Sequence, residues 1–211
     1  MNEKIYRLQK KEVDRRNAEA AALKNAINDV FYKNNFVKHE YDSDEIFEQA
    51  VLFGENLTIF ARDCMRLNSD EILVERNFVQ KQILMNSVRS GSFTIEDYYI
   101  VGFAKIRSGY PRILITPTTL ADKFIYLIGN KANPVTRNKK CLFHFNIHHE
   151  QNKPVIKPLP DQFFESLIRF KELHLEISGE YCFYVASTKG VTVAEAERFI
   201  DLTGVIMKCL I

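Results

Sequence analysis

The stretch YYIVGFAKI at residues 98–106 decides the fold class, because an unbroken run of β-branched and aromatic side chains is typical of a strand. The turn sequence SGYP follows at 108–111, and the apolar run ILI comes next at 113–115. This order predicts a β-hairpin.

Further strands are expected toward the C-terminus. Residues 141–149 and 173–177 alternate apolar and polar side chains, which is the period of a strand with one buried face. The sequence SGE at 178–180 predicts a tight turn into a last strand over 181–187. The sequence therefore indicates a second hairpin and one additional strand.

Helices are predicted between and after these strands. The pair Thr116 and Pro117 fits a helix start, and a short helix is expected over 161–170. Thr192 and Glu195 have the spacing of a capping box, so we expect the last helix to run from there to the C-terminus.

The N-terminal part has a different pattern. Residues 3–32 contain neither Pro nor Gly and are rich in Ala, which predicts one long helix. Two further helices are expected over 42–64 and 68–88, each opened by a capping pattern. We therefore predict an α+β fold, with N-terminal helices followed by a mixed, largely antiparallel sheet covered by helices. The expected parts are a helical region, 1–90, and an α+β domain, 91–211.

Composition speaks against a disordered chain and against a strongly charged one. The chain is 46% hydrophobic, so it can bury a core, and its 29 basic and 27 acidic side chains leave a net charge of only +2. Four dispersed cysteines and no apolar leader lead us to expect reduced thiols and a cytoplasmic location. Motifs for phosphate loops, dinucleotide binding, serine hydrolysis and zinc proteolysis are absent from the sequence.

The first sixteen residues form the strongest candidate for a docking element. They contain six basic and three acidic side chains, a local charge of +3, but few apolar ones. Such a helix cannot bury much surface in a core of its own, so a partner surface is the expected environment. The candidate docking residues are Ile5, Leu8, Lys10, Lys11, Arg15 and Arg16.

Three of the five histidines lie within FHFNIHHE, residues 143–150, and invite a metal site. On a strand, however, His144 and His148 are roughly 13 Å apart, and neighbouring side chains point to opposite faces. We therefore expect no metal and no cofactor. The preferred interpretation is a surface strand, and the alternative is a cleft in which His144 or His148 acts as an acid or base.

A basic loop offers the remaining candidate site. Lys131, Arg137, Lys139 and Lys140 lie close together in the sequence, where they could contact an anion such as a phosphate. No aromatic residue is interleaved within this run, which weakens the case for nucleic acid.

These observations support three hypotheses for function. The leading one is a non-enzymatic interaction or assembly protein, a subunit of a larger complex that binds a protein partner or a second copy through the N-terminal helix. The first alternative is an enzyme, or the inactive relative of one, with a polar site around the strand from His144 to Glu150. The second alternative is a nucleic-acid accessory protein. Because the sequence lacks the catalytic motifs named above, we favour a protein that is not an enzyme.

Overall fold

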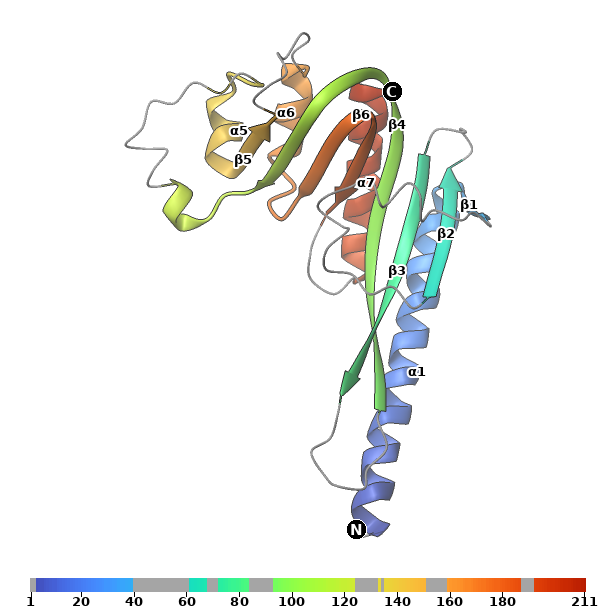
Figure 1. Cartoon of the computed structure of the whole chain (residues 1–211). Helices are drawn as coiled ribbons and strands as arrows, with labels where there is room; N and C mark the ends of the chain where they lie inside the picture. The colour runs from blue at the N-terminus through green and yellow to red at the C-terminus, as the bar shows by residue number, and fades with distance from the viewer. Residues whose placement is uncertain are drawn as a thin grey trace.

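A computed structural model of the chain describes residues 3–39, 61–67, 72–83, 93–123, 133, 135–150, 159–186 and 192–211. It is an α+β protein built on a six-stranded antiparallel sheet (Figure 1). The strands are paired in the order β1-β2-β3-β4-β5, and β6 pairs with β4. The elements are α1 (Glu3–Lys33), β1 (Phe36–His39), β2 (Ala61–Leu67), β3 (Ile72–Ile83), β4 (Phe93–Pro117), α5 (Lys139–His144), β5 (Phe145–His149), α6 (Asp161–Leu167), β6 (His174–Val185) and α7 (Val193–Leu210).

The 25-residue strand β4 organises the sheet. Its first half pairs with β3 along the whole length of β3, from Ile72 opposite Ala104 to Ile83 opposite Phe93. From Gly102 onward β4 also pairs with β6, on its other edge, and from Ile113 to Pro117 it pairs with β5. Strands on both sides of residue 90 therefore belong to one sheet.

The two predicted hairpin turns are not turns. Both β4 and β6 continue through them as single strands, and Tyr110 of the first turn sequence pairs with Gly179 of the second. The register shifts on both sides of this pair, and Gly179 has a φ of +60°, a backbone conformation that glycine adopts easily. The turn sequences therefore form the two sides of one bulged bend, where β4 arches over in Figure 1.

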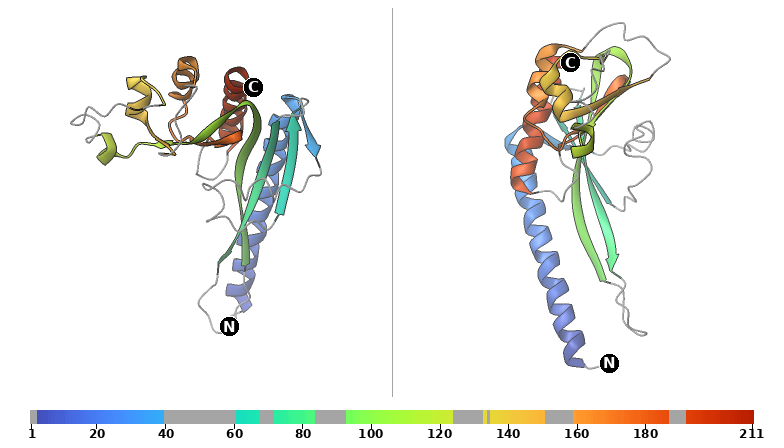
Figure 2. Two further views of the ribbon diagram at one scale, coloured as in Figure 1. Left: turned by 45° about the horizontal axis from the view of Figure 1, so that its top comes forward. Right: turned by 90° about the vertical axis from the view of Figure 1, so that its left-hand side faces the viewer.

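The main core lies between the sheet and a layer of helices. Figure 2 shows α1 and α7 on the same face of the sheet. The Phe31 ring of α1 lies 6.1 Å from the Phe199 ring of α7, and Phe199 stacks on Tyr184 of β6 at 5.1 Å between ring centroids. All three rings are fully or almost fully buried. A smaller cluster on the opposite face of β4 and β6 contains Val101, Phe103, Phe183 and Val185.

Several predicted elements are confirmed. The long N-terminal helix is α1, the short helix at Asp161 is α6, and the last helix is α7. Both hydrogen bonds of the predicted capping box are present, because Thr192 Oγ1 accepts from the Glu195 amide and the Glu195 carboxylate accepts from the Thr192 amide. The fold class is therefore as predicted.

Other predicted elements are wrong. The segment expected to be helical over 68–88 contains strand β3, and the end of the helix expected over 42–64 is occupied by β2. Residues 1–90 are thus not uniformly helical. The helix expected at Thr116 starts later, because β4 continues to Pro117 and helical backbone begins at Leu120. The capping patterns that opened the helices over 42–64 and 68–88 lie outside the described residues.

The strand expected over 141–149 begins late as well. Residues 139–144 form α5, because the Asn138 side chain accepts a hydrogen bond from the Cys141 amide at 3.0 Å and caps the helix. Within the described ranges, no helix is both long and apolar enough to span a bilayer.

Candidate functional site

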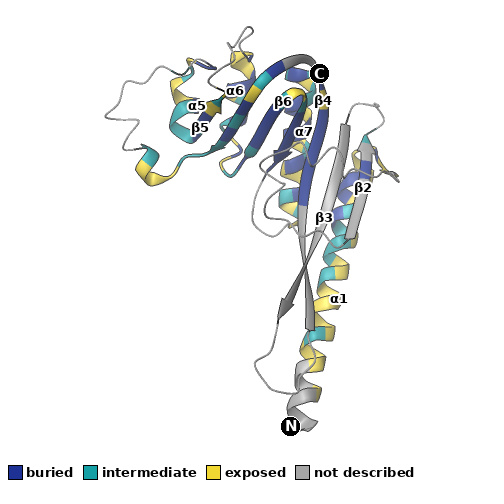
Figure 3. Cartoon of the chain, in the orientation of Figure 1, coloured by how far each residue is buried: buried dark blue, intermediate teal, exposed yellow. Residues whose placement is uncertain are grey.

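The two halves of α1 have different environments (Figure 3). In the C-terminal half, Ile27, Val30 and Phe31 are buried in the main core. Between Lys10 and Glu19, by contrast, every side chain is exposed except Val13, which is half-buried. The helix of 31 residues is about 45 Å long, so its N-terminal half extends well away from the core.

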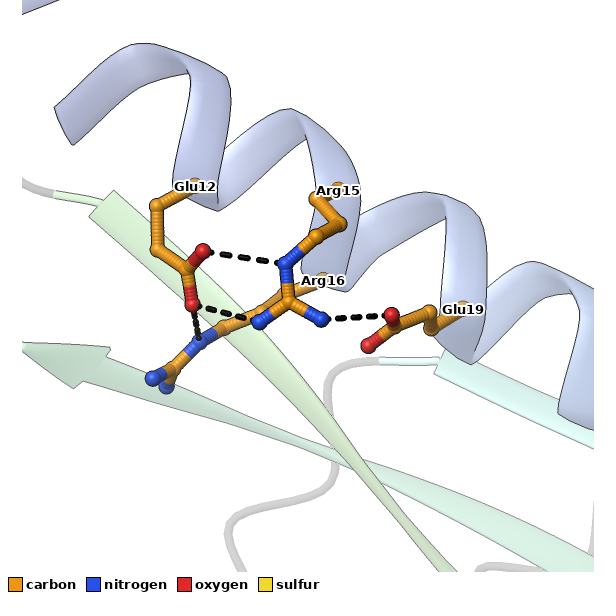
Figure 4. A network of polar contacts seen from close by, with 4 residues as sticks. All are labelled: Glu12, Arg15, Arg16 and Glu19. Atoms are coloured by element: carbon orange, nitrogen blue, oxygen red, sulfur yellow. Dashed lines mark hydrogen bonds and ion pairs between the residues drawn. The ribbon is translucent and has the colours of Figure 1, made fainter. Parts of the chain in front are cut away.

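Ion pairs within the helix engage the two arginines of the predicted docking element (Figure 4). Arg15 donates to both Glu12 oxygens, at 3.0 and 2.7 Å, and it also pairs with Glu19. Arg16 Nε donates to Glu12 Oε1 at 2.9 Å. Hydrogen bonds from Arg15 and Arg16 lower the pKa of Glu12 to about 2. Most of the arginine charge is therefore balanced inside the helix.

The predicted docking residues consequently differ in what they offer. Lys10 and Lys11 are exposed, and no ion pair within the described part of the chain includes either one. Ile5 and Leu8 lie on the first turns of α1, but their side chains are outside the description. The two lysines are thus the cationic side chains most available to a partner.

The predicted polar strand face exists, but His144 is not part of it. Phe145 and Ile147 of β5 are buried, whereas His148 and Glu150 are exposed, as the alternation predicted. Leu114 of β4 pairs with His148 on one side and with Glu176 of β6 on the other. Two strand spacings, roughly 10 Å, therefore separate His148 from Glu176.

An acidic residue from another segment joins this face. Asp122 Oδ2 accepts hydrogen bonds from the Thr119 amide and hydroxyl, at 2.8 and 2.7 Å, and from Asn146 Nδ2 at 2.8 Å. These hydrogen bonds lower the pKa of Asp122, and the charge of His148 lowers it further. Because three donors already contact this oxygen, its most direct role is to hold the end of β4 against β5.

Sequence alone did not single out the ion pair at the centre of the polar face. Glu176 is only 1% exposed, and its Oε1 lies 3.1 Å from Arg112 Nε of β4. The alternation of β6 places Glu176 opposite the apolar core face, so its polar orientation was predictable. Its burial was not, because that depends on the cross-strand contact with Arg112.

The thiols of Cys141 and Cys182 are poor candidates for nucleophiles. Cys141 and Cys182 are completely buried. Burial raises the pKa of the Cys141 thiol to about 12 and raises that of Cys182 as well. Both thiols therefore stay protonated near neutral pH.

The basic loop forms a larger cationic surface than the sequence indicated. Arg137, Lys139 and Lys140 are exposed at the start of α5, and Lys131 lies outside the described residues. The charges of two lysines distant in sequence, Lys123 and Lys171, act on His144, the last residue of the same helix. Burial is the main cause that lowers the pKa of His144, and the charges of Lys123 and Lys171 lower this pKa further.

Aromatic rings also lie at this surface. The Lys123 ammonium lies 5.2 Å from the centroid of the half-buried Phe143 ring. The His144 ring stands nearly perpendicular to Phe143, with their centroids 5.6 Å apart. We call Lys123, Arg137, Lys139, Lys140, His144 and Lys171 the α5 basic patch.

Among the described residues, no three His, Cys, Asp or Glu side chains are grouped as a metal site would require. A comparison of the chain with protein-family models, curated proteins and solved structures found no match.

Proposed function

We propose that the protein is a non-enzymatic assembly protein, a subunit of a larger complex, that docks on a protein partner through the N-terminal half of α1. The observation that carries this proposal is the difference in burial between the two halves of α1. Its C-terminal half is fixed by Ile27, Val30 and Phe31 in the core, while the described side chains from Lys10 to Glu19 remain exposed except Val13. A helix held at one end presents the other end at a fixed angle, which suits docking in a groove.

The contacts within α1 indicate the chemistry of the partner. Arg15 and Arg16 are balanced by Glu12 and Glu19, so they stiffen the helix more than they attract a charged surface. Lys10 and Lys11 supply the positive charge, which a groove with acidic residues at its rim would complement. Ile5 and Leu8 are the apolar anchors expected to enter that groove.

Catalysis has less support. The thiols of Cys141 and Cys182 are buried and protonated, and His144 and His148 lie on different elements, α5 and β5. An acid-base site would need one of these histidines to face a carboxylate inside a hollow. His148 instead lies exposed beside an Asp122 carboxylate that already accepts three hydrogen bonds.

Deletion of residues 1–16 tests the proposal. We expect the thermal midpoint to change by only a few degrees, corresponding to about 1 kcal/mol or less, because the described side chains from Lys10 to Arg16 are exposed except Val13. The deletion should abolish self-association in light scattering, or capture of a partner from a lysate of the native host. Light scattering of the intact chain distinguishes the two kinds of partner, because only binding to a second copy would raise the mass of the purified protein.

Two matched charge reversals localise the effect. Lys10→Glu with Lys11→Glu should weaken docking, whereas Lys139→Glu with Lys140→Glu, an equal change of charge on α5, should leave it unaffected. If the truncated chain unfolds while the Lys10 and Lys11 variant still assembles normally, residues 1–16 are core structure and the proposal is wrong.

A further inference from the structure

The α5 basic patch brings together cations from three separate segments. Lys123 follows β4, Arg137, Lys139 and Lys140 begin α5, and Lys171 follows α6. The Lys123 ammonium lies 5.2 Å from the centroid of the Phe143 ring of α5, and the charges of Lys123 and Lys171 both act on His144. The net charge of +2 for the whole chain therefore conceals a local concentration of positive charge.

The first turn of α5 has no acidic residue of its own to balance these cations. It contains Lys139 and Lys140, although the dipole of a helix favours acidic side chains there. Lys140 and His144 are four residues apart, a spacing at which like charges repel when the imidazole is protonated.

The half-buried ring of Phe143 narrows the choice of anion. It lies within the patch, with Lys123 over its face and the His144 ring at its side. Cations that follow a phosphate backbone, combined with aromatic rings on which bases stack, are the usual elements of single-strand binding. The aromatic residue that the loop sequence lacked is thus supplied by the helix that follows it.

We propose that the α5 basic patch binds the phosphate backbone of single-stranded nucleic acid, with a base that displaces the Lys123 ammonium from the face of Phe143 and stacks on this ring. An acidic protein surface would also match the charges, so the test includes an acidic polypeptide of equal charge. The site is independent of docking through α1, since the two surfaces share no residue.

The probe is a fluorescein-labelled oligothymidylate of about twelve nucleotides, within the usual range of single-strand site sizes, titrated by fluorescence anisotropy. We expect binding at low salt that weakens steeply as salt rises. Lys140→Gln and Lys171→Gln should each reduce the slope of log affinity against log salt by about 0.7, the contribution of one phosphate contact to a single strand. Lys10→Gln with Lys11→Gln, on the exposed half of α1, should change neither affinity nor slope.

Phe143→Leu separates stacking from charge. It should lower affinity by about tenfold, in line with the loss of one base stack, and leave the salt slope unchanged. Circular dichroism melting checks that each variant is folded. The proposal is overturned if the oligonucleotide does not bind at low salt, if polyglutamate of equal charge binds as tightly, or if folded Phe143→Leu binds like the parent chain.

Discussion

At the scale of single residues, the contact between Gly102 and Tyr184 determines how tightly β4, β6 and α7 pack. The two residues are partners in the register of β4 and β6, and a Cβ atom on residue 102 would lie only 2.1 Å from Tyr184 Cζ. The Tyr184 ring is held on its other side by Phe199, and its hydroxyl lies 2.9 Å from Thr203 Oγ1. The ring therefore has little freedom to move away.

We expect Gly102→Ala to lower the free energy of unfolding by about 2 kcal/mol or more, because the added methyl group overpacks the site. Urea denaturation measures the loss. The double variant Gly102→Ala with Tyr184→Leu should be less destabilised than the sum of the single variants, since the smaller side chain leaves room for the methyl group. Additive losses would show that the clash is relieved elsewhere.

At the scale of elements, side-chain capping patterns predicted helices with mixed success, because the segment 68–88, which also began with such a pattern, contains strand β3. Thr192 and Glu195 fixed the start of α7 correctly. The spacing of apolar residues misled at β3, because Ile72, Leu73 and Val79 fit a helical period as well as a strand. This segment forms a strand because it pairs with β4 along its whole length, and the local sequence does not reveal that pairing.

The turn sequences show the same limit in another form. Gly109 and Pro111 on β4, and Gly179 on β6, are ordinary turn residues in ordinary turn spacing. In the sheet, the two segments meet across Tyr110 and Gly179, and the backbone freedom of Gly179 serves a bulge. Only the register between distant strands distinguishes a bend from two hairpins.

Two substitutions in α7 should change stability in opposite directions. Thr192→Ala removes the cap and should lower the free energy of unfolding by about 1 kcal/mol. Gly204→Ala should raise it by up to about 1 kcal/mol, because Gly204 is an exposed helical residue and a Cβ there would meet no atom. Thermal melts monitored by circular dichroism compare the two, and a loss of stability in the alanine variant at 204 would contradict this account.

At the scale of the whole molecule, the candidate sites were only partly predictable. The exposed face of α1 and the lysines of α5 are local features, and the sequence identified both. The approach of Lys123 and Lys171 to His144 and the burial of Glu176 beside Arg112 depend on how β4, α6 and β6 pack together. Charges gathered from separate segments cannot be found from spacing along the chain.

The division of α1 also predicts how protection from solvent varies along the molecule. The first half can open by breaking helical hydrogen bonds and the exposed ion pairs of Glu12, whereas opening the second half would expose Ile27, Val30 and Phe31. Hydrogen exchange measured by mass spectrometry should therefore show faster exchange for residues 3–19 than for residues 23–33.

A single substitution at Glu12 should increase the difference in hydrogen-exchange rate between the two halves of α1. Glu12→Gln weakens the pairs with Arg15 and Arg16, so exchange in the first half of α1 should accelerate while the second half and the thermal midpoint stay unchanged. The same pairs depend on pH. Because the pKa of Glu12 is lowered in the fold, their contribution is complete above the ordinary range of a carboxylate and is lost as the pH falls toward about 2. Equal protection along the whole of α1 would show that its first half is held by the rest of the molecule and is not free to dock.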